Sequence, residues 1–316
     1  MERTKINKYF PEDVVFLEKS KDFVKKPAAI LCSDMHLRED TPICWTGDFQ
    51  KEQWSTVEYI AKLQRKYNCP VIHAGDLFHH WKSSPWLLSM VFDTLPEQFY
   101  TIYGQHDLPQ HNIDLESKCG LYCLTVAGRI KLLPAAHYNQ LPPKEGSLYF
   151  PNRTPDRRIL VWHHLTYITK PFPGASDGQA DSLLRKYPQF DLIVTGDNHQ
   201  SFTTEYKGRV LVNPGCMTRQ KTDEAEYKPS VYLWYAKDNS VERVYLPAQE
   251  GVISREHIEV KEQRDQRIQA FISRLNDDYE ADISFEENLE RFFKKNKIKD
   301  SIKDIIYKAI DNEKST

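Results

Sequence analysis

The chain contains 316 residues, and its 43 lysines and arginines nearly balance its 45 aspartates and glutamates. This balance argues against a histone-like protein that binds nucleic acid through its overall charge. The six cysteines form no CxxC pair, a pattern typical of neither a zinc module nor a disulfide-stabilised secreted domain. No stretch approaches the ~20 apolar residues of a membrane span, and residues 1–20 lack an apolar signal core. We therefore expect a reduced, cytoplasmic protein with no membrane contact.

Short apolar runs along the first part of the chain predict strands that are buried on both faces. In chain order, these runs occupy residues 28–36, 70–76, 99–107, 158–164, 190–199 and 209–215, and each of them ends in polar residues. Helix-like stretches at 48–67 and 178–187 lie between some of the runs. This alternation predicts a layered α/β domain, in which ligands collect at the carboxyl ends of the strands.

The remaining segments complete the predicted organisation. The Pro- and Asn-rich stretch 133–157 predicts a long surface loop, and 230–246 predicts a hairpin that closes the main domain. After residue 252, apolar residues recur at helical spacing in three segments, and Ser284 with Glu287 forms a capping-box pattern at the second. We therefore predict a main domain at 1–250 and a helical C-terminal extension at 251–316.

The polar residues at the strand ends are of the types that bind divalent metal ions. They are Asp34 and His36, Asp76 and His79, Gln105, His106 and Asp107, His163 and His164, and Asp197 and His199. Carboxylates, imidazoles and an amide oxygen suit Mn, Mg, Fe or Zn, and the lack of thiolates in the set argues against a structural zinc site. Two ions about 3.5–4 Å apart can share a carboxylate and a water, whose pKa a bound ion lowers from about 15.7 to about 7.

Each pattern alone has a simpler explanation. Gly104, Asp107 and Pro109 would suit a tight turn after a strand, and Asp34 with His36 would suit another. It is the recurrence of such residues after one predicted strand after another that favours a metal centre over a series of turns.

Five of these patterns, in this order, resemble the calcineurin-like metallophosphoesterase superfamily between residues 28 and 246: DMH, GDLFH, GQHD, HH and GDNH. Within that superfamily, AGDLFH at 74–79 is similar to the SbcD-like DNA repair nucleases, and GQHDLP resembles phage-encoded members of that group. The later NPGC, at 213–216, is similar to the family's PGS turn. The resemblance implies a sandwich of two mixed sheets flanked by helices, with the extension 251–316 as a docking segment for an SbcC-like ATPase.

The resemblance also implies a role for each residue. Asp34, His36 and His199 would hold the first metal ion, Asp76 would bridge the two ions, and Gln105, His163 and Asp197 would hold the second. His106 would face the scissile phosphate, Asp107 would orient the His106 ring through a hydrogen bond, and His79 would lie beside the substrate strand. Family position selects His163 rather than His164 as the ligand.

Two residues depart from the family's pattern. Gln105 stands where the family usually has Asn, and Asp197 stands where it usually has His. Gln keeps the carbonyl ligand on a longer side chain, whereas Asp replaces a neutral nitrogen with an anionic oxygen. Our hypothesis is that both changes suit the second site to Mn²⁺, the ion we expect, or to Mg²⁺.

The leading hypothesis is a Mn-dependent phosphodiester hydrolase acting on DNA, an SbcD-like exo- or endonuclease in repair, recombination or phage DNA processing. Metal-activated hydroxide would attack in line, His106 would assist the leaving group, and Arg38 and Arg219 would contact substrate phosphates. The expected partners are DNA, an SbcC-like ATPase and a second copy of the chain, in the host cytoplasm if a phage encodes it. The alternatives are a phosphoesterase for small molecules, cyclic nucleotides or phosphoproteins, and a non-catalytic DNA-binding scaffold.

Overall fold

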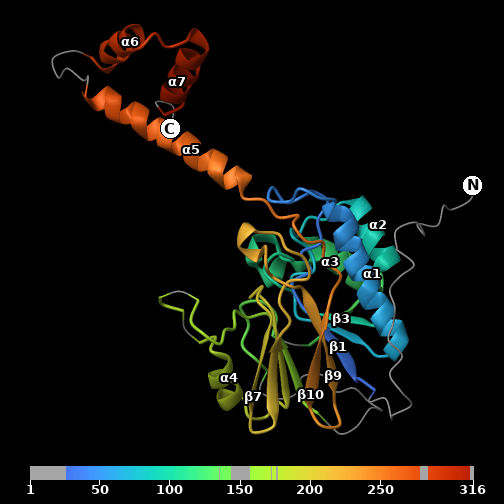
Figure 1. The fold of residues 1–316 in the computed structure, drawn as a ribbon. Helices are drawn as coiled ribbons and strands as arrows, with labels where there is room; N and C mark the ends of the chain where they lie inside the picture. The colour runs from blue at the N-terminus through green and yellow to red at the C-terminus, as the bar shows by residue number, and fades with distance from the viewer. Residues whose placement is uncertain are drawn as a thin grey trace, which may run out of the picture. The chain divides into compact units, whose positions relative to one another are not determined.

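The strands form two mixed sheets in the computed structural model, which describes residues 26–134, 136–143, 157–171, 173–175, 177–277 and 284–313 (Figure 1). In the first sheet, β1 (Ala29–Cys32), β2 (Val71–His73), β3 (Phe99–Thr101) and β4 (Lys131–Leu132) are parallel. The antiparallel hairpin of β9 (Ser230–Tyr235) and β10 (Ser240–Tyr245) extends this sheet beside β1. In the second sheet, β5 (Ile159–Trp162), β6 (Leu192–Thr195) and β8 (Arg209–Asn213) are parallel, and β7 (Phe202–Tyr206) pairs antiparallel with β8.

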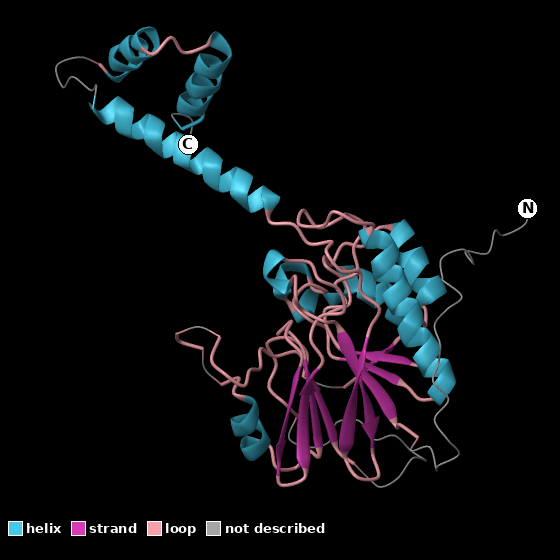
Figure 2. Ribbon diagram, viewed as in Figure 1, coloured by secondary structure: helices cyan, strands magenta, loops and turns pink. Residues whose placement is uncertain are grey.

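The two sheets pack face to face, and helices cover their outer faces (Figure 2). The first sheet carries α1 (Phe49–Tyr67), α2 (Pro85–Thr94) and α3 (Gly120–Val126), and the second carries α4 (Ala180–Lys186). Along β1, Ile30 and Cys32 pack towards the helices, whereas Ala29 and Leu31 pack between the sheets. Because both faces of the strand are buried, its sequence is continuously apolar. The predicted layered α/β fold with two mixed sheets is confirmed.

Several predicted elements appear with close to their expected bounds. The helix expected at 48–67 is α1, which begins after the N-cap Asp48, whose side chain accepts a hydrogen bond from Lys51 N at 3.0 Å. The hairpin expected at 230–246 is β9–β10. The sequence reasoning did not predict the edge strand β7, because its half-buried residues alternate with exposed ones and contain no apolar run. Residues 135 and 144–156 of the expected surface loop, and the first 25 residues of the chain, lie outside the described residues.

The chain divides into two compact units, and Ile43–Thr46 belongs with the residues from Val252 onward. Within this second unit, Thr46 N donates to Val252 O at 2.9 Å and Ser254 N donates to Cys44 O at 2.7 Å. No local sequence pattern predicts this pairing, because it joins segments that are far apart in the chain.

The second unit contains the three expected helices: α5 (Glu256–Asp277), α6 (Phe285–Lys295) and α7 (Asp300–Glu313). The predicted capping box at the start of α6 is present, with Ser284 and Glu287 hydrogen-bonded in both directions. Leu289, Phe292 and Phe293 of α6 form a small core with partly buried side chains that include Ile306 of α7. None of the helices described combines the length and apolar character of a membrane span.

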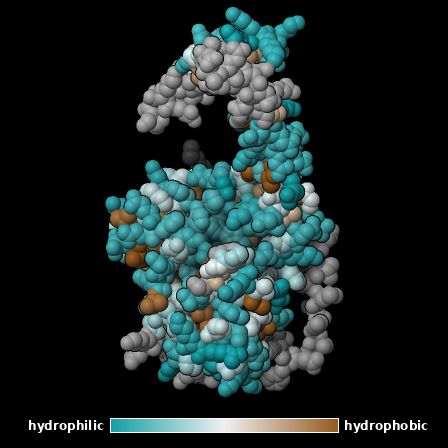
Figure 3. Space-filling view, turned by 90° about the vertical axis from the view of Figure 1, so that its left-hand side faces the viewer, coloured by the Kyte–Doolittle hydropathy of each residue, from teal (hydrophilic) through white to brown (hydrophobic). Residues whose placement is uncertain are grey.

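The surface is mainly polar on the face that Figure 3 presents. Over the described residues of that face, hydrophobic residues lie in small, separate groups among hydrophilic ones. Isolated apolar side chains of this kind are ordinary on a protein surface and do not by themselves mark a binding site. The polar strand ends are therefore the stronger candidate for a functional site.

Candidate metal centre

Loops at the carboxyl ends of five parallel strands carry the predicted metal-binding side chains. Asp34 and His36 follow β1, Asp76 and His79 follow β2, Gln105, His106 and Asp107 follow β3, His163 and His164 follow β5, and Asp197 and His199 follow β6. Parallel strands within one sheet end at the same edge, so each sheet gathers its own residues. His36, which follows a strand of the first sheet, lies 3.2 Å through its Nε2 from Nε2 of His199, which follows a strand of the second sheet. These edges of the two sheets therefore meet.

The first group of ligands surrounds His36. Its Nε2 lies 3.8 Å from Asp34 Oδ1, 3.7 Å from Asp76 Oδ2 and 3.2 Å from His199 Nε2. Asp34, His36 and His199 can each offer one ligand atom with all three atoms within 4.8 Å of one another. These are the residues predicted for the first metal ion, and the structure brings them together with Asp76.

The second group surrounds Asp76. His163 Nε2 lies 3.4 Å from Asp76 Oδ2, and ligand atoms of Asp34, Asp76 and His163 lie within 4.8 Å of one another. Gln105 and Asp197 meet beside them, with Gln105 Nε2 donating to Asp197 Oδ1 at 2.6 Å. The amide oxygen of Gln105, the atom expected to bind metal, is buried and accepts no hydrogen bond from the described residues. Asp76 and Asp34 therefore each lie close to members of both groups, and of the two it is Asp76 whose Oδ2 lies between His36 and His163, as its predicted bridging role requires.

The backbone at the centre is held in an unusual conformation. Asp34, His36, Asp76 and Asp197 all have positive φ, at 48°, 44°, 57° and 75°. Non-glycine residues seldom adopt this left-handed region, which costs of order 1–3 kcal/mol per residue and clusters at functional sites. The backbone conformation that directs these four side chains towards the centre therefore lowers the free energy of unfolding.

Two glycines make room for this arrangement. A Cβ atom at Gly104 would lie 2.1 Å from Asp76 Oδ1, and one at Gly75, whose φ is +95°, would lie 2.4 Å from His163 Nδ1. Neither distance is compatible with a side chain. The glycines of the two motifs thus allow Asp76 and His163 to approach the loops that surround them.

Hydrogen bonds at the far ring nitrogens fix the orientation of two of the imidazoles. His163 Nδ1 donates to Ala74 O at 2.7 Å, and His199 Nδ1 donates to Glu224 Oε1 at 2.8 Å. With the proton on Nδ1, the Nε2 lone pair of each ring is directed into the centre. This is how a protein usually presents histidine to a metal ion.

The buried atoms of the centre fit a divalent cation. Asp76 Oδ2, His163 Nε2 and Gln105 Oε1 are buried and have no hydrogen-bond partner among the described residues. Unsatisfied buried polar atoms are rare in native proteins and call for an explanation such as a bound ion. A carboxylate oxygen, an imidazole nitrogen and an amide oxygen converging here are ligands for Mn, Mg, Fe or Zn.

The charges of these groups depend on one another. Burial raises the pKa of Asp34 to about 6, although the nearby His163 and His199 act in the opposite direction. Burial alone would raise the pKa of Asp76, but the adjacent His163 holds it below its ordinary value. For His163 the effect of burial has the opposite sign, because burial disfavours the charged imidazolium and lowers its pKa. The adjacent Asp76 carboxylate outweighs burial and raises the pKa of His163. A divalent cation bound here would neutralise the buried carboxylates and would bind His163 through its neutral imidazole.

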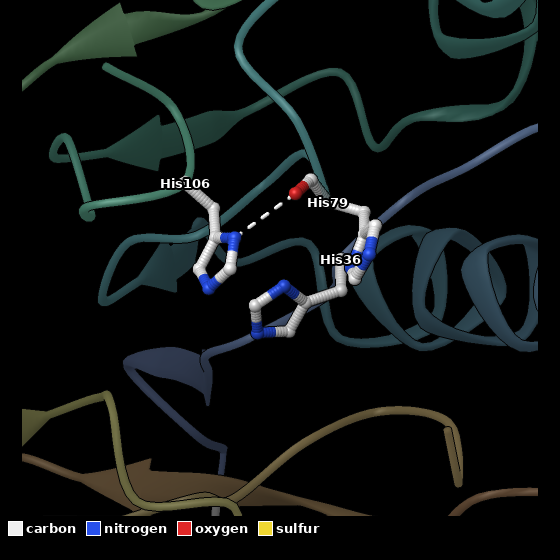
Figure 4. A group of neighbouring side chains, drawn as sticks. All are labelled: His36, His79 and His106. Atoms are coloured by element: carbon white, nitrogen blue, oxygen red, sulfur yellow. Dashed lines mark hydrogen bonds between the residues drawn. The ribbon is translucent and has the colours of Figure 1, made fainter. Parts of the chain in front are cut away.

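His106 and His79 lie together beside His36, at the mouth of the centre (Figure 4). The His106 and His79 rings are stacked, with centroids 5.7 Å apart and an interplanar angle of 18°. His106 Nδ1 donates to His79 O at 3.0 Å, and His106 N donates to Asp76 Oδ1 at 2.8 Å. The ring is therefore oriented by the loop after β2, and Nε2 is the atom left for a substrate.

The predicted hydrogen bond from His106 to Asp107 is wrong. Asp107 is fully buried, and its carboxylate accepts from Leu77 N at 3.2 Å, Phe78 N at 3.0 Å and Gly104 N at 3.0 Å. Three backbone N–H groups that converge on one carboxylate outcompete a neighbouring ring. Asp107 thus joins the loops after β2 and β3, and His79 O takes the orienting role.

The predicted substrate contact of Arg219 is also wrong, because the side chain is only 4% exposed. It donates to Ala225 O at 3.2 Å and to Gln249 O, and it pairs with buried Glu52 at 3.5 Å. It borders a separate cavity of about 700 Å³. A flanking basic residue has here been used to neutralise an internal carboxylate.

His164 faces away from the centre. Its ring stacks on Trp162 with centroids 4.0 Å apart, and its Nε2 donates to Asp177 O at 3.3 Å. His163, in contrast, lies against Asp76. The two side chains thus point in different directions, and of the pair only His163 reaches the centre.

The centre opens into a pocket of about 410 Å³. Predicted site residues that line it are His36, Arg38, His79, Gln105, His106, Asp197 and His199. Arg38 forms an ion pair with Asp40 and donates to Gln220 Oε1 at 3.2 Å, so its guanidinium is held at the pocket wall. Lys221 adds an exposed cation.

The sequence reasoning missed Glu224 and Asn198, which also line the pocket. Burial would raise the pKa of Glu224, but the hydrogen bond from His199 holds it below its ordinary value, so the carboxylate is ionised. Asn198, which lies between Asp197 and His199, donates through Nδ2 to Thr166 O at 2.7 Å and so joins the loop after β6 to the loop after β5. Glu224 is close to His199 only in the folded chain, and Glu226 nearby looks equivalent to it in the sequence.

The family model of the calcineurin-like phosphoesterase superfamily domain matches residues 28–234. No curated protein matches the chain. Among solved structures, an archaeal phosphodiesterase is 14% identical, with 69% of this chain and 99% of that chain covered and a TM-score of 0.39.

Two further structures are similar at the same level. A putative 5'-nucleotidase from Staphylococcus aureus is 12% identical, with 75% of this chain and 58% of that chain covered and a TM-score of 0.41. Vacuolar protein sorting 29 from Cryptosporidium parvum is 14% identical, with 70% and 97% covered and a TM-score of 0.34.

Proposed function

The chain belongs to the calcineurin-like phosphoesterase superfamily, and from this premise we propose that it is a metal-dependent phosphodiester hydrolase that acts on DNA. The observation that carries the proposal is the convergence of His36, Asp76 and His163 from three strand ends, with separations of 3.7 Å and 3.4 Å around Asp76 Oδ2. Asp76 Oδ2 and His163 Nε2 are buried without a hydrogen-bond partner among the described residues. Such atoms are ready to bind cations rather than to stabilise the fold.

The family resemblance assigns the residues that would hold two metal ions, and the observed contacts support this assignment. Asp34, His36 and His199 would hold one ion, Gln105, His163 and Asp197 would hold the other, and Asp76 would contact both. When bound, Mn²⁺ or Mg²⁺ would neutralise phosphate charge and lower the pKa of a water. The anionic Asp197 and the amide oxygen of Gln105 are hard oxygen ligands, which is why we propose Mn²⁺ rather than Zn²⁺.

The protein's own side chains would position the phosphate. Arg38 and Lys221 at the pocket wall would attract the anionic substrate. His106, held through Nδ1 by His79 O, would present Nε2 to the scissile phosphate and protonate the leaving oxygen. Stacked His79 would keep that ring from rotating and contact the substrate strand.

A series of rings that begins next to His106 supports a substrate that carries bases. His111 lies 6.5 Å from the His106 centroid and 6.0 Å from that of Tyr138, and Tyr138 lies 6.3 Å from His163. His111 is exposed and Tyr138 is half-buried. Exposed rings next to a phosphate site can stack on nucleobases, an interaction worth about 1–3 kcal/mol per base. A phosphate ester that carries no base would gain nothing from them.

The decisive experiment is cleavage of end-labelled duplex and single-stranded DNA in Mn²⁺, Mg²⁺ or EDTA, with His106→Ala in parallel. We expect Mn²⁺-dependent products for the wild type and a loss of at least about 100-fold for the variant, typical of general acid–base residues. The variant should still bind metal, because His106 is outside the ligand set.

Other outcomes would contradict specific parts. Undiminished cleavage by His106→Ala would remove the role of His106. Hydrolysis of a small diester or phosphoprotein with DNA left intact would keep the centre and replace the substrate. No hydrolysis of any of these, even with an ATPase partner present, would favour the scaffold alternative.

We further propose that the helical extension docks an SbcC-like ATPase, with a second copy of the chain in the assembly. The exposed apolar side chains Phe285, Ile302 and Ile305 support this, since helices bind partners through apolar anchors. A pull-down should lose the ATPase when the segment 251–316 is deleted or when Ile302 and Ile305 are both changed to Asp. Unchanged binding by the point variant would refute docking through these residues.

A further inference from the structure

Glu224 occupies a specific place behind the first group of ligands. It is 3% exposed and lies in the short 3-10 helix η3 (Thr222–Glu224). Its Oε1 accepts from His199 Nδ1 at 2.8 Å, while its Oε2 accepts from Gln220 N at 2.7 Å and Lys221 N at 3.2 Å. Both carboxylate oxygens therefore accept hydrogen bonds, one from the His199 ring and the other from the backbone of the turn.

From this geometry we propose that Glu224 is the positioning residue of the first metal ion. Through Oε1 it fixes His199 with Nε2 towards the ion, and through Oε2 it closes the turn that carries Gln220. The inference deepens the function proposed above and rests on its dinuclear centre.

The His199 contact determines which ring nitrogen can bind metal. An ionised carboxylate only accepts hydrogen bonds, so Nδ1 must carry the proton and Nε2 must carry the lone pair. Nε2 of His199 faces Nε2 of His36 at 3.2 Å. Two nitrogen lone pairs repel each other at this separation unless a cation or a proton lies between them. Because Glu224 holds the proton on Nδ1, the Nε2 lone pair of His199 is available to the cation.

The three imidazoles of the centre differ in what holds them. His199 has a carboxylate at Nδ1, and His163 has the neutral carbonyl of Ala74. The Nδ1 of His36 is buried and has no hydrogen-bond partner in the described part of the chain. A carboxylate at the far nitrogen raises the basicity of the ring, and loss of such a partner typically lowers metal affinity about 10–100-fold. Glu224 thus strengthens one ligand in particular.

The turn closed by Glu224 acts on a second ligand of the same ion. Gln220 Nε2 donates to the backbone oxygen of His36 at 3.1 Å, and Gln220 Oε1 accepts from Arg38 Nη1 at 3.2 Å. The carboxylate therefore supports His199 directly and His36 through the Gln220 side chain. Nothing comparable links Glu224 to His163 among the contacts described.

Glu224→Gln is a sharp test because the amide cannot satisfy both tasks. If its oxygen faces His199, its NH₂ group meets the N–H donors of Gln220 and Lys221 and the turn must open. If its NH₂ faces His199, it donates to Nδ1 and forces the ring proton onto Nε2, which removes the metal-binding lone pair. The substitution keeps the size of the side chain, so the fold should survive.

The measurement is titration of the metal-free protein with Mn²⁺ by isothermal calorimetry, together with its thermal midpoint without metal. His199→Ala and His163→Ala provide the binding patterns of a damaged first and a damaged second site. Glu226→Gln is the matched control, because Glu226 is exposed and lies two residues away. We expect Glu224→Gln to match His199→Ala in pattern, with first-site affinity about 10–100-fold weaker, second-site affinity retained, and wild-type behaviour for the control.

Raising the Mn²⁺ concentration should also restore hydrolysis by Glu224→Gln with a kcat near that of the wild type, which a general structural defect would not allow. Unchanged affinity at both sites would overturn the proposal. So would equal weakening of both sites with a lowered thermal midpoint, because Glu224 would then support the fold as a whole. A failure of the DNA proposal would be seen in the wild type itself and would leave this metal titration interpretable.

Discussion

His199 and His163 occupy corresponding places in the two halves of the centre, yet different kinds of group hold them. Nδ1 of His163 donates to the carbonyl of Ala74, which directly follows strand β2. Nδ1 of His199 donates to Glu224, which lies on a 3-10 turn outside both sheets. The sheet itself therefore preorganises the His163 half, whereas the His199 half depends on a loop.

The comparison teaches that a ligand's strength is decided partly by residues that a motif does not contain. A backbone carbonyl next to a strand is fixed whenever the sheet forms, and almost any sequence supplies it. A carboxylate on a turn can be changed by a single substitution. The His199 half is accordingly the part of the centre that substitutions outside the motifs can most easily weaken.

The largest effect should come from Asp76, which the two halves share. In Asp76→Asn the carboxylate that faces both His36 and His163 loses its charge. We expect both Mn²⁺ sites to weaken and DNA cleavage to fall by at least about 100-fold, because the ions and their bridge are affected together. Calorimetry and the cleavage assay measure this, with the exposed pocket residue Asp223 changed to Asn as the control. Retention of two tight sites would show that the halves do not share Asp76.

A smaller and one-sided effect is expected from Asp197→His, which restores the residue usual in the family. The substitution replaces an anionic oxygen with a neutral nitrogen in the His163 half only. We expect the preference for Zn²⁺ over Mn²⁺ at that site to rise about tenfold, since imidazole suits zinc better. Competition between the two ions for the metal-free protein tests this. A change confined to the His199 half would contradict the assignment of Asp197.

The smallest effect is expected from Gln105→Asn. The shorter side chain keeps the carbonyl ligand but pulls its NH₂ group away from Asp197 Oδ1, now 2.6 Å from Gln105 Nε2. Gln105 lines the open pocket, so water can replace the lost hydrogen bond. The net cost is then about 0.5–1 kcal/mol, and a weakening of about 2- to 5-fold is expected for the second ion. Mn²⁺ calorimetry measures it, and an equal effect on the first ion would argue against the division into halves.

The candidate ligands that the structure brings together could be recognised in the sequence because each follows an apolar run. Asp34, Asp76 and His163 come after strands whose continuous burial gives a clear pattern, and parallel strand ends meet at one edge. The layered α/β class and the extension helices follow from the same periodicities, whereas the division of the strands into two mixed sheets was expected only from the family resemblance. The pattern could not predict the backbone conformation. Asp34 and Asp76 have positive φ because the surrounding loops impose it, and no glycine at either position indicates it in the sequence.

The contacts of Asp107 and Arg219 could not be predicted from the local sequence, for a different physical reason. Asp107 is next to His106 in the chain, but its carboxylate is taken by three backbone N–H groups from two loops. Arg219 looks like a phosphate contact until the fold buries it against Glu52. These contacts join residues far apart in sequence, and nothing in either local segment specifies them.

The most direct test of the account is the number of Mn²⁺ ions that the metal-free wild-type protein binds, measured by equilibrium titration with His163→Ala beside it. Two tight sites in the wild type and one in the variant would be the result predicted by a dinuclear centre that shares Asp76 between two halves. A single site in the wild type, or loss of both sites in His163→Ala, would contradict it.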